Sequence, residues 1–150
     1  MKLTSYTNYA LRTLQMAAIR TPHLVRIDEI AQAHRINRAH LTKVVHQLAQ
    51  AGYVETIRGP KGGLRLAVPA SGIIVGDVVR LTEGPLDIVE CFNPAINTCK
   101  LRGICKLSTA LQQATAAFIA VLDDLSLADI AINRGDLLAR LGLPDTAASR

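Results

Sequence analysis

The sequence has no tryptophan, and aromatic residues make up only 3% of its 150 residues. A chain of this length is expected to form one domain, or a small domain with an appendage. The 49% hydrophobic content can build a core, and because aromatic residues are so few this core must be aliphatic, which suits packed helices. No apolar run approaches the roughly 18 residues that a membrane span needs. The N-terminus also lacks the long apolar segment of a signal peptide. We therefore expect a cytoplasmic protein that does not associate with membranes.

Acidic residues are scarce in the first half of the chain. Residues 1–68 contain ten Lys and Arg against three acids, whereas residues 69–150 contain seven against nine. The two balances are +7 and −2, and all four histidines also lie in the first half. This asymmetry favours a polyanionic partner for the first half alone, although a solvated basic surface would give the same counts.

Cysteine is also scarce, and its three copies, Cys91, Cys99 and Cys105, lie close together in the sequence. Pro94 and Gly103 break regular structure between them, so we expect the thiols on an irregular loop. An odd number of cysteines cannot all pair within one chain. Without a signal peptide, such thiols indicate metal or redox chemistry rather than structural disulfides.

Apolar residues at helical spacing predict helices over residues 6–19, 27–34 and 38–51. Ser5 is the predicted N-cap of the first helix and Asn37 that of the third. In the third helix Leu41, Val44, Val45 and Leu48 form a core stripe, and the opposite face is polar and basic. Two short helices joined by a tight turn match a helix-turn-helix, and equally an ordinary helical hairpin with a polar outer face.

A basic hairpin follows these helices. Residues 54–57 and 63–68 are predicted strands, and the segment between them carries a glycine-rich turn with Arg58 and Lys61 at its tip. Such a slim, cationic tip can enter a DNA minor groove, so the combination indicates a winged helix-turn-helix that binds duplex DNA. The predicted DNA contacts are Asn37, Arg38, His40, Thr42 and Lys43 on the third helix, and Arg58, Gly59, Lys61 and Arg65 on the wing.

The second half of the chain is predicted to be helical. A helix over residues 73–82, irregular near Gly76, precedes the cysteines, and a long helix begins at Lys106 directly after them. Its apolar residues recur at heptad spacing, which favours pairing with a second copy, or else packing on the chain's own domain. Short helices over residues 127–133, capped by Ser126, and 135–141 follow. The predicted dimer contacts are Leu107, Leu111, Phe118, Val121 and Leu125.

The predicted fold is mainly α, a homodimer with four segments in each chain. Residues 1–70 form the winged helix-turn-helix domain, and residues 71–105 form a connecting helix and the cysteine loop. Residues 106–143 form the dimerisation helix and C-terminal helices, and residues 144–150 form a flexible tail.

Three chemistries compete for the cysteines. Structural zinc sites use closely spaced pairs, and gaps of seven and five residues are wide for them. A catalytic cysteine needs a neighbouring base, and the loop offers only cations. An iron–sulfur cluster tolerates wide spacing, and cations offset its charge. The spacing favours a cluster modestly, and a thiol redox or zinc-stapled interaction domain stays open.

Four segments carry a resemblance, namely residues 1–12, 54–66, 76–80 and 89–99. Together they resemble the NsrR/IscR/RirA family of bacterial winged-helix regulators over residues 1–143, and most closely its NsrR-type, nitric-oxide-sensing branch. The resemblance implies a homodimeric repressor of double-stranded operator DNA, not an enzyme. It also implies an iron–sulfur cluster, of the 4Fe-4S rather than the 2Fe-2S type, on Cys91, Cys99 and Cys105. Nitric oxide would then attack the irons and release the DNA.

Asn8 departs from the pattern of some family members. In those members an acidic residue at this position, donated by the first helix of the other subunit, is the fourth cluster ligand. The amide oxygen of Asn8 is a weak iron ligand, so the fourth ligand stays open. The iron-responsive RirA-type regulators resemble this opening, including the Asn8 position, and are the alternative within the family.

Overall fold

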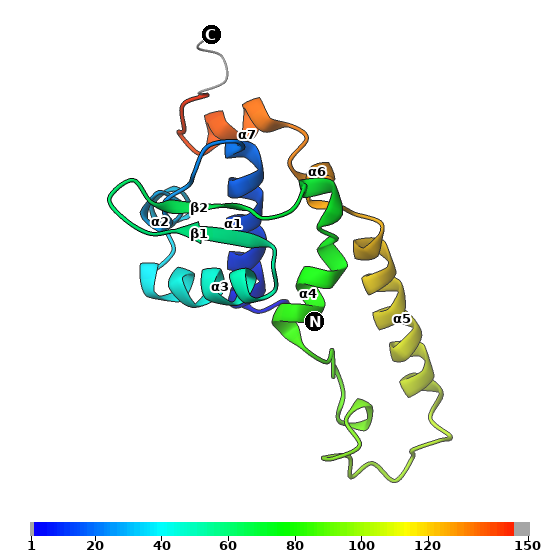
Figure 1. The fold of residues 1–150 in the computed structure, drawn as a ribbon. Helices are drawn as coiled ribbons and strands as arrows, with labels where there is room; N and C mark the ends of the chain where they lie inside the picture. The colour runs from blue at the N-terminus through cyan, green and yellow to red at the C-terminus, as the bar shows by residue number, and fades with distance from the viewer. Residues whose placement is uncertain (1, 146–150) are drawn as a thin grey trace.

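The computed structural model describes residues 2–145, which form a helical body with a two-stranded wing and a projecting arm (Figure 1). The body contains α1 (Ser5–Arg20), α2 (Ile27–His34), α3 (Arg38–Gln50), β1 (Val54–Ile57), β2 (Gly63–Leu66), the 3-10 turn η1 (Ala70–Gly72), α6 (Leu127–Ile130) and α7 (Arg134–Arg140). The arm contains α4 (Val75–Glu83), the 3-10 turn η2 (Glu90–Phe92) and α5 (Lys106–Asp123). No helix in the described part of the chain is long and apolar enough to cross a bilayer.

Helix α1 is the centre of the aliphatic core. Its residues Leu14 and Ala17 are fully buried, and so are Leu41, Val44 and Leu48 of α3. The predicted stripe of the third helix is therefore confirmed as its core face. The N-cap of α1 was predicted wrongly, because Thr4 rather than Ser5 accepts a hydrogen bond from the Thr7 amide, at 3.3 Å.

The turn between α2 and α3 places the predicted N-cap residue, Asn37, at the start of α3. The Asn37 side chain accepts a hydrogen bond from the Ala39 amide at 2.8 Å, which confirms it as the N-cap of α3. This bond satisfies one of the free amides at the start of a helix. The α3 helix ends at Gln50, one residue earlier than predicted.

The connecting helix α4 begins at Val75 rather than at the predicted residue 73, because the main chain of residues 73–75 pairs with the segment that leads into α6. The Ile73 carbonyl accepts a hydrogen bond from the Leu127 amide at 2.7 Å, and Val75 donates to the Leu125 carbonyl at 2.8 Å. The expected irregularity at Gly76 was wrong. Gly76 lies inside α4, where a Cβ atom would come within 1.9 Å of the Asp123 carboxylate on α5.

The wing is an antiparallel hairpin in which Val54 pairs with Leu66 and Ile57 pairs with Gly63. Its second strand ends at Leu66, two residues before the predicted end. Leu64 also exchanges two main-chain hydrogen bonds with Val25, at 2.8 and 2.9 Å, just before α2. The wing is therefore fixed to the segment that leads into the helix-turn-helix.

Replacing Gly62 in the wing turn by alanine should destabilise the wing. A Cβ atom there would lie 2.2 Å from the main-chain carbonyl oxygen of Ile57, so the hairpin backbone must shift. We expect the free energy of unfolding to fall by about 1–3 kcal/mol, as for other overpacked sites, with weaker DNA binding. Thermal unfolding measures the first effect. Gly135→Ala on α7 is the control, because a Cβ there meets nothing within 4 Å.

The C-terminal helices return to the body and pack on α1. Gln15 donates to the Ile130 carbonyl and Arg134 donates to the Ile19 carbonyl, each at 2.6 Å. Ser126 is confirmed as the cap of α6, although α6 is shorter than predicted. The division of the chain at residues 70, 105 and 143 stays a prediction. Residues 146–150 of the predicted tail lie outside the described residues.

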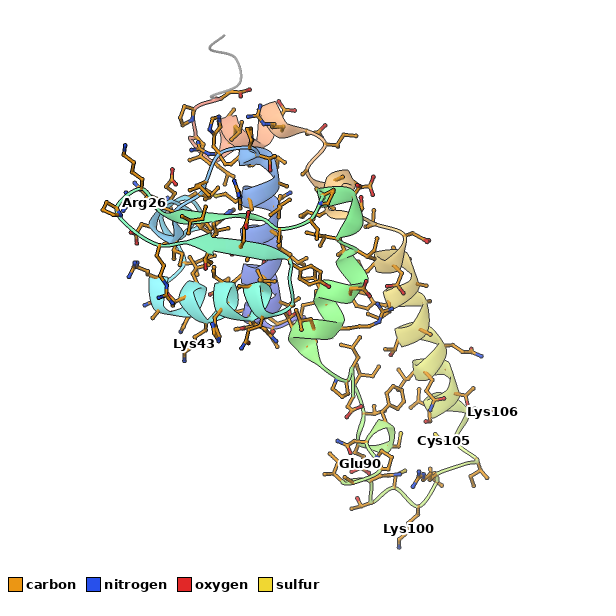
Figure 2. All side chains as sticks on the ribbon, viewed as in Figure 1. Arg26, Lys43, Glu90, Lys100, Cys105 and Lys106 are labelled. Atoms are coloured by element: carbon orange, nitrogen blue, oxygen red, sulfur yellow. The ribbon has the colours of Figure 1, made fainter. Side chains whose placement is uncertain are left out.

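The cysteine loop and α5 are the least buried part of the described chain, with no buried residue between 80 and 126. Helices α4 and α5 lie side by side, and the cysteine loop joins their far ends (Figures 1 and 2). No residue of α5 is buried. Leu107 is 66% exposed and Val121 is 63% exposed, while Leu111, Phe118 and Leu125 are half-buried. Packing on the chain's own domain therefore covers only one side of this apolar helix.

Candidate metal centre and nucleic-acid interface

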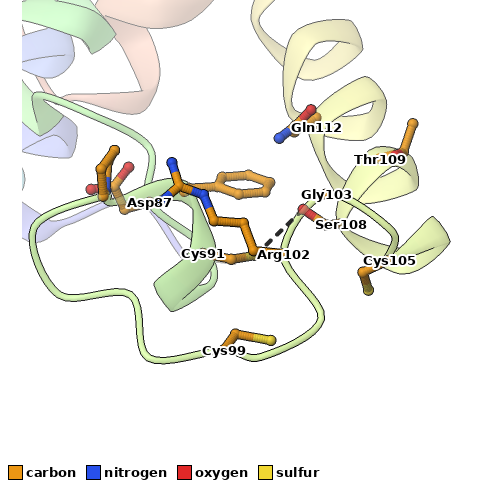
Figure 3. Close-up of a pocket in the computed structure, with 11 residues that line it drawn as sticks. Asp87, Cys91, Cys99, Arg102, Gly103, Cys105, Ser108, Thr109 and Gln112 are labelled. Atoms are coloured by element: carbon orange, nitrogen blue, oxygen red, sulfur yellow. Dashed lines mark hydrogen bonds between the residues drawn. The ribbon is translucent and has the colours of Figure 1, made fainter.

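The three cysteines line one cavity of about 620 Å³ at the far end of the arm (Figure 3). The cavity lies between the loop after α4 and the first turns of α5. All three thiols are free and half-buried. The volume is far above the roughly 30 Å³ that one water molecule occupies in the liquid, so the cavity has room for a group of several atoms.

Each cysteine occupies a defined place in the structure around the cavity. The Cys91 sulfur lies 3.4 Å from the Ser108 hydroxyl, which joins η2 to the first turn of α5. The Cys99 amide donates to the Asn97 side chain at 2.9 Å and closes a tight turn. Cys105 is the N-cap residue of α5. Cys91 and Cys105 are thus both placed at the beginning of α5, the first by its contact with Ser108 and the second by its position in the chain.

The residues around the cavity, three cysteines and the cation Arg102, fit an iron–sulfur cluster. Within residues 2–145, no three His, Cys, Asp or Glu side chains lie close enough together to hold one metal ion. A cluster of several irons spans a wider set of thiolates, and Arg102 in the cavity lining can offset its negative charge. The cavity lining also includes one carboxylate, Asp87, which the sequence reasoning did not single out.

Asn8 is not among the residues that line the cavity of its own subunit. Its side chain is exposed in the first turns of α1. A role as fourth ligand would therefore have to come from a second subunit, as the resemblance implies, and stays a prediction.

The predicted DNA-contact residues lie on α3, at its cap and on the wing. His40, Thr42 and Lys43 are exposed on the outer face of α3. Arg38 forms an ion pair with Asp28 at 2.6 Å. The other predicted contacts are the helix cap Asn37, the exposed wing residues Arg58, Gly59 and Lys61, and Arg65, which pairs with Glu55 across the hairpin.

Helix α1 connects this surface to the arm. The Tyr6 hydroxyl donates to the Lys43 carbonyl at 3.2 Å, and the Tyr9 ring stacks on His40 with centroids 6.3 Å apart. At the start of α1, the Thr4 amide donates to the Glu83 carboxylate at 2.6 Å. Glu83 is the last residue of α4, directly before the cysteine loop. These long-range contacts carry no sequence signal.

The sequence matches a family model, described as Rrf2, an iron-dependent transcriptional regulator, over residues 3–133. The chain belongs to the Rrf2 family. It is 44% identical over 147 residues to the HTH-type transcriptional regulator NsrR of Shouchella clausii, across 97% of this chain and 99% of that protein. It is also 44% identical over 146 residues to the NsrR of Bacillus subtilis, across 97% of this chain and all of that protein.

Among solved structures, the fold is similar to the oxidized form of CymR from Staphylococcus aureus. The TM-score is 0.70 at 28% identity, covering 87% of this chain and 96% of that one. The predicted winged-helix fold is thus confirmed. Because the Rrf2 relatives are transcriptional regulators, the expectation that the chain is not an enzyme is confirmed as well.

Proposed function

We propose that this Rrf2-family protein is a homodimeric transcriptional repressor that senses nitric oxide through an iron–sulfur cluster, of the 4Fe-4S type, held by Cys91, Cys99 and Cys105. The observation that carries the proposal is the convergence of all three thiols on one cavity at the end of the arm. The nearly full-length similarity to two regulators named NsrR supports the repressor role, and the resemblance to NsrR-type regulators implies nitric oxide as the signal. When bound, the cluster supplies irons that react with nitric oxide.

Different residues around the cavity have different roles in holding the cluster. The three thiolates bind the irons, Arg102 balances negative charge, and Ser108 holds the Cys91 sulfur in place by a hydrogen bond. The fourth ligand is either Asn8 of the other subunit or Asp87, whose anionic oxygen lies in the same cavity lining.

A change in the loop can reach the DNA surface through α1. Glu83 anchors the first turn of α1 through Thr4 and Thr7, and α1 contacts the recognition helix through Tyr6 and Tyr9. In dimers of this kind the half-sites lie about 34–36 Å apart, so a small tilt of the two recognition helices prevents both from docking. Release of the loop is therefore expected to release the operator.

An anaerobic titration tests the proposal. An operator duplex is first selected from a random library with the loaded protein. Loaded protein is expected to be brown, to contain iron and sulfide, and to lose operator binding as nitric oxide is added. The variant with Cys91, Cys99 and Cys105 all replaced by Ser should lack iron and fail to hold the operator.

Three other results would contradict the proposal. Colourless protein that binds the operator equally well with the three thiols replaced would remove the sensor. Stoichiometric zinc without iron or sulfide would favour the zinc-stapled domain. Operator release by iron chelation, with no response to nitric oxide, would favour an iron-responsive repressor of the RirA type.

A further inference from the structure

A second groove, of about 350 Å³, lies between the recognition helix and the wing. Its walls are the first turn of α2, the first residue of α3, the end of β1 and the glycines of the wing turn. Three arginines, Arg26, Arg38 and Arg58, line it, and all three are exposed. Figure 2 shows Arg26 beside the wing. Sequence reasoning assigned Arg38 and Arg58 to DNA but gave Arg26 no role.

The place of the groove determines what can occupy it. In duplex DNA a phosphate strand separates each major groove from the neighbouring minor groove. A recognition helix in the major groove and a wing in the adjacent minor groove therefore lie on either side of that strand. The space between α3 and the wing tip is this groove, so the strand's phosphates must pass over it.

The charges of the groove match a phosphate strand. Within residues 2–145, the guanidinium groups of Arg26 and Arg58 make no hydrogen bond or ion pair, so both can bind a ligand. Arg38 instead pairs with Asp28 at 2.6 Å, with both side chains more than half exposed. Such an exposed pair is weak, so Asp28 restrains Arg38 but a nearby phosphate can still compete for its guanidinium group.

We propose that Arg26, together with Arg58, binds a phosphate of the DNA strand that runs between the recognition helix and the wing, and that Asp28 restrains Arg38 and lowers the affinity of this groove for DNA. Main-chain contacts fix the position of Arg26. Its amide donates to Glu29 at 2.7 Å, and the preceding residue, Val25, pairs with Leu64 of the wing. This proposal rests only on the DNA-binding part of the proposed function.

The test measures DNA affinity by fluorescence anisotropy across a salt series, with the selected operator and a random-sequence duplex of equal length. Arg26→Ala is expected to weaken both complexes by the same factor, about tenfold, because a phosphate contact is independent of sequence. The slope of log K against log salt should fall by about 0.9. Arg26→Lys should keep most of the slope, and Asp28→Asn should tighten both complexes.

Arg140→Ala is the matched control, since it removes the same charge from the exposed face of α7. Two results would overturn the proposal. One is an Arg26→Ala effect no larger than that of Arg140→Ala. The other is a loss confined to the operator with an unchanged salt slope, which would indicate base contact or altered helix packing. Wild-type protein that binds neither duplex would refute the proposed function itself, which separates the two failures.

Discussion

Replacing Leu107 and Val121 together by glutamate is expected to produce a monomer that binds its operator about 10²- to 10⁴-fold more weakly than the native dimer. In a dimer, the second half-site is bound at a high effective concentration set by the first. A monomer loses this gain although each recognition helix keeps all its contacts.

The exposed face of α5 is the reason for choosing these two residues. They lie near the two ends of the predicted heptad seam and are the most exposed large apolar side chains of α5, at 66% and 63%. The apolar surface continues onto the cysteine loop, where Ile96 is 62% exposed and Ile104 is 79% exposed. A second copy of the chain would cover both surfaces at once, which explains an 18-residue helix with no buried residue.

Sedimentation velocity and operator titration measure the two effects. Gln113→Glu adds one negative charge at an exposed polar position of α5 and should leave the dimer intact. Circular dichroism should show that the double variant keeps its helices, because neither replaced side chain contributes to the core of the single chain. A double variant that sediments as a dimer would show that the subunits meet elsewhere.

The predictable parts of this fold depend on local signals. The stripe Leu41, Val44 and Leu48 and the cap Asn37 define α3 without reference to the rest of the chain, and the glycine-rich turn defines the wing. The heptad of α5 shows in the same way that one face of the helix is apolar. Each of these features is encoded within about ten consecutive residues, so sequence periodicity detects it.

The unpredicted parts depend on residues that are distant in the sequence. Thr4 and Glu83 are 79 positions apart, and Gln15 meets the Ile130 carbonyl across 115 positions. Every residue has a main-chain carbonyl, so the residue type at position 130 does not indicate that its carbonyl accepts this hydrogen bond. The same holds for Ser108, because a serine in the first turn of a helix is common and only the fold brings it to Cys91.

Glu83→Ala is expected to abolish the dependence of DNA binding on the cluster while the cluster itself stays bound. Glu83 accepts hydrogen bonds from the Thr4 amide at 2.6 Å and the Thr4 hydroxyl at 3.0 Å, and also from the Thr7 hydroxyl. Without its carboxylate, the cysteine loop can move without moving α1. Allosteric couplings are typically about 5- to 150-fold, and we expect the affinity ratio between loaded and cluster-free protein to fall to about twofold or less.

The ratio is measured from operator titrations of both forms, alongside the iron content and the rate of the nitric oxide reaction. Asp136→Ala, which removes an exposed carboxylate from α7, should change none of these quantities. A Glu83→Ala protein with a native affinity ratio would show that the signal reaches α3 by another route. Loss of iron in this variant would instead assign Glu83 to the cluster site.

The pH dependence of the affinity ratio shows whether the Glu83 carboxylate must be charged to hold Thr4 and Thr7. Partial burial raises the pKa of Glu83, but the hydrogen bonds from Thr7 and Thr4 outweigh it and hold the pKa below its ordinary value. Because the folded pKa is the lower one, the stabilisation is complete above the ordinary pKa and is lost as pH falls through the folded pKa. The affinity ratio should therefore be constant between about pH 6 and 8 if Glu83 alone controls it. Glu83→Gln, which keeps an acceptor oxygen without the charge, should retain part of the ratio, since hydrogen bonds to a charged acceptor are roughly twice as strong as neutral ones.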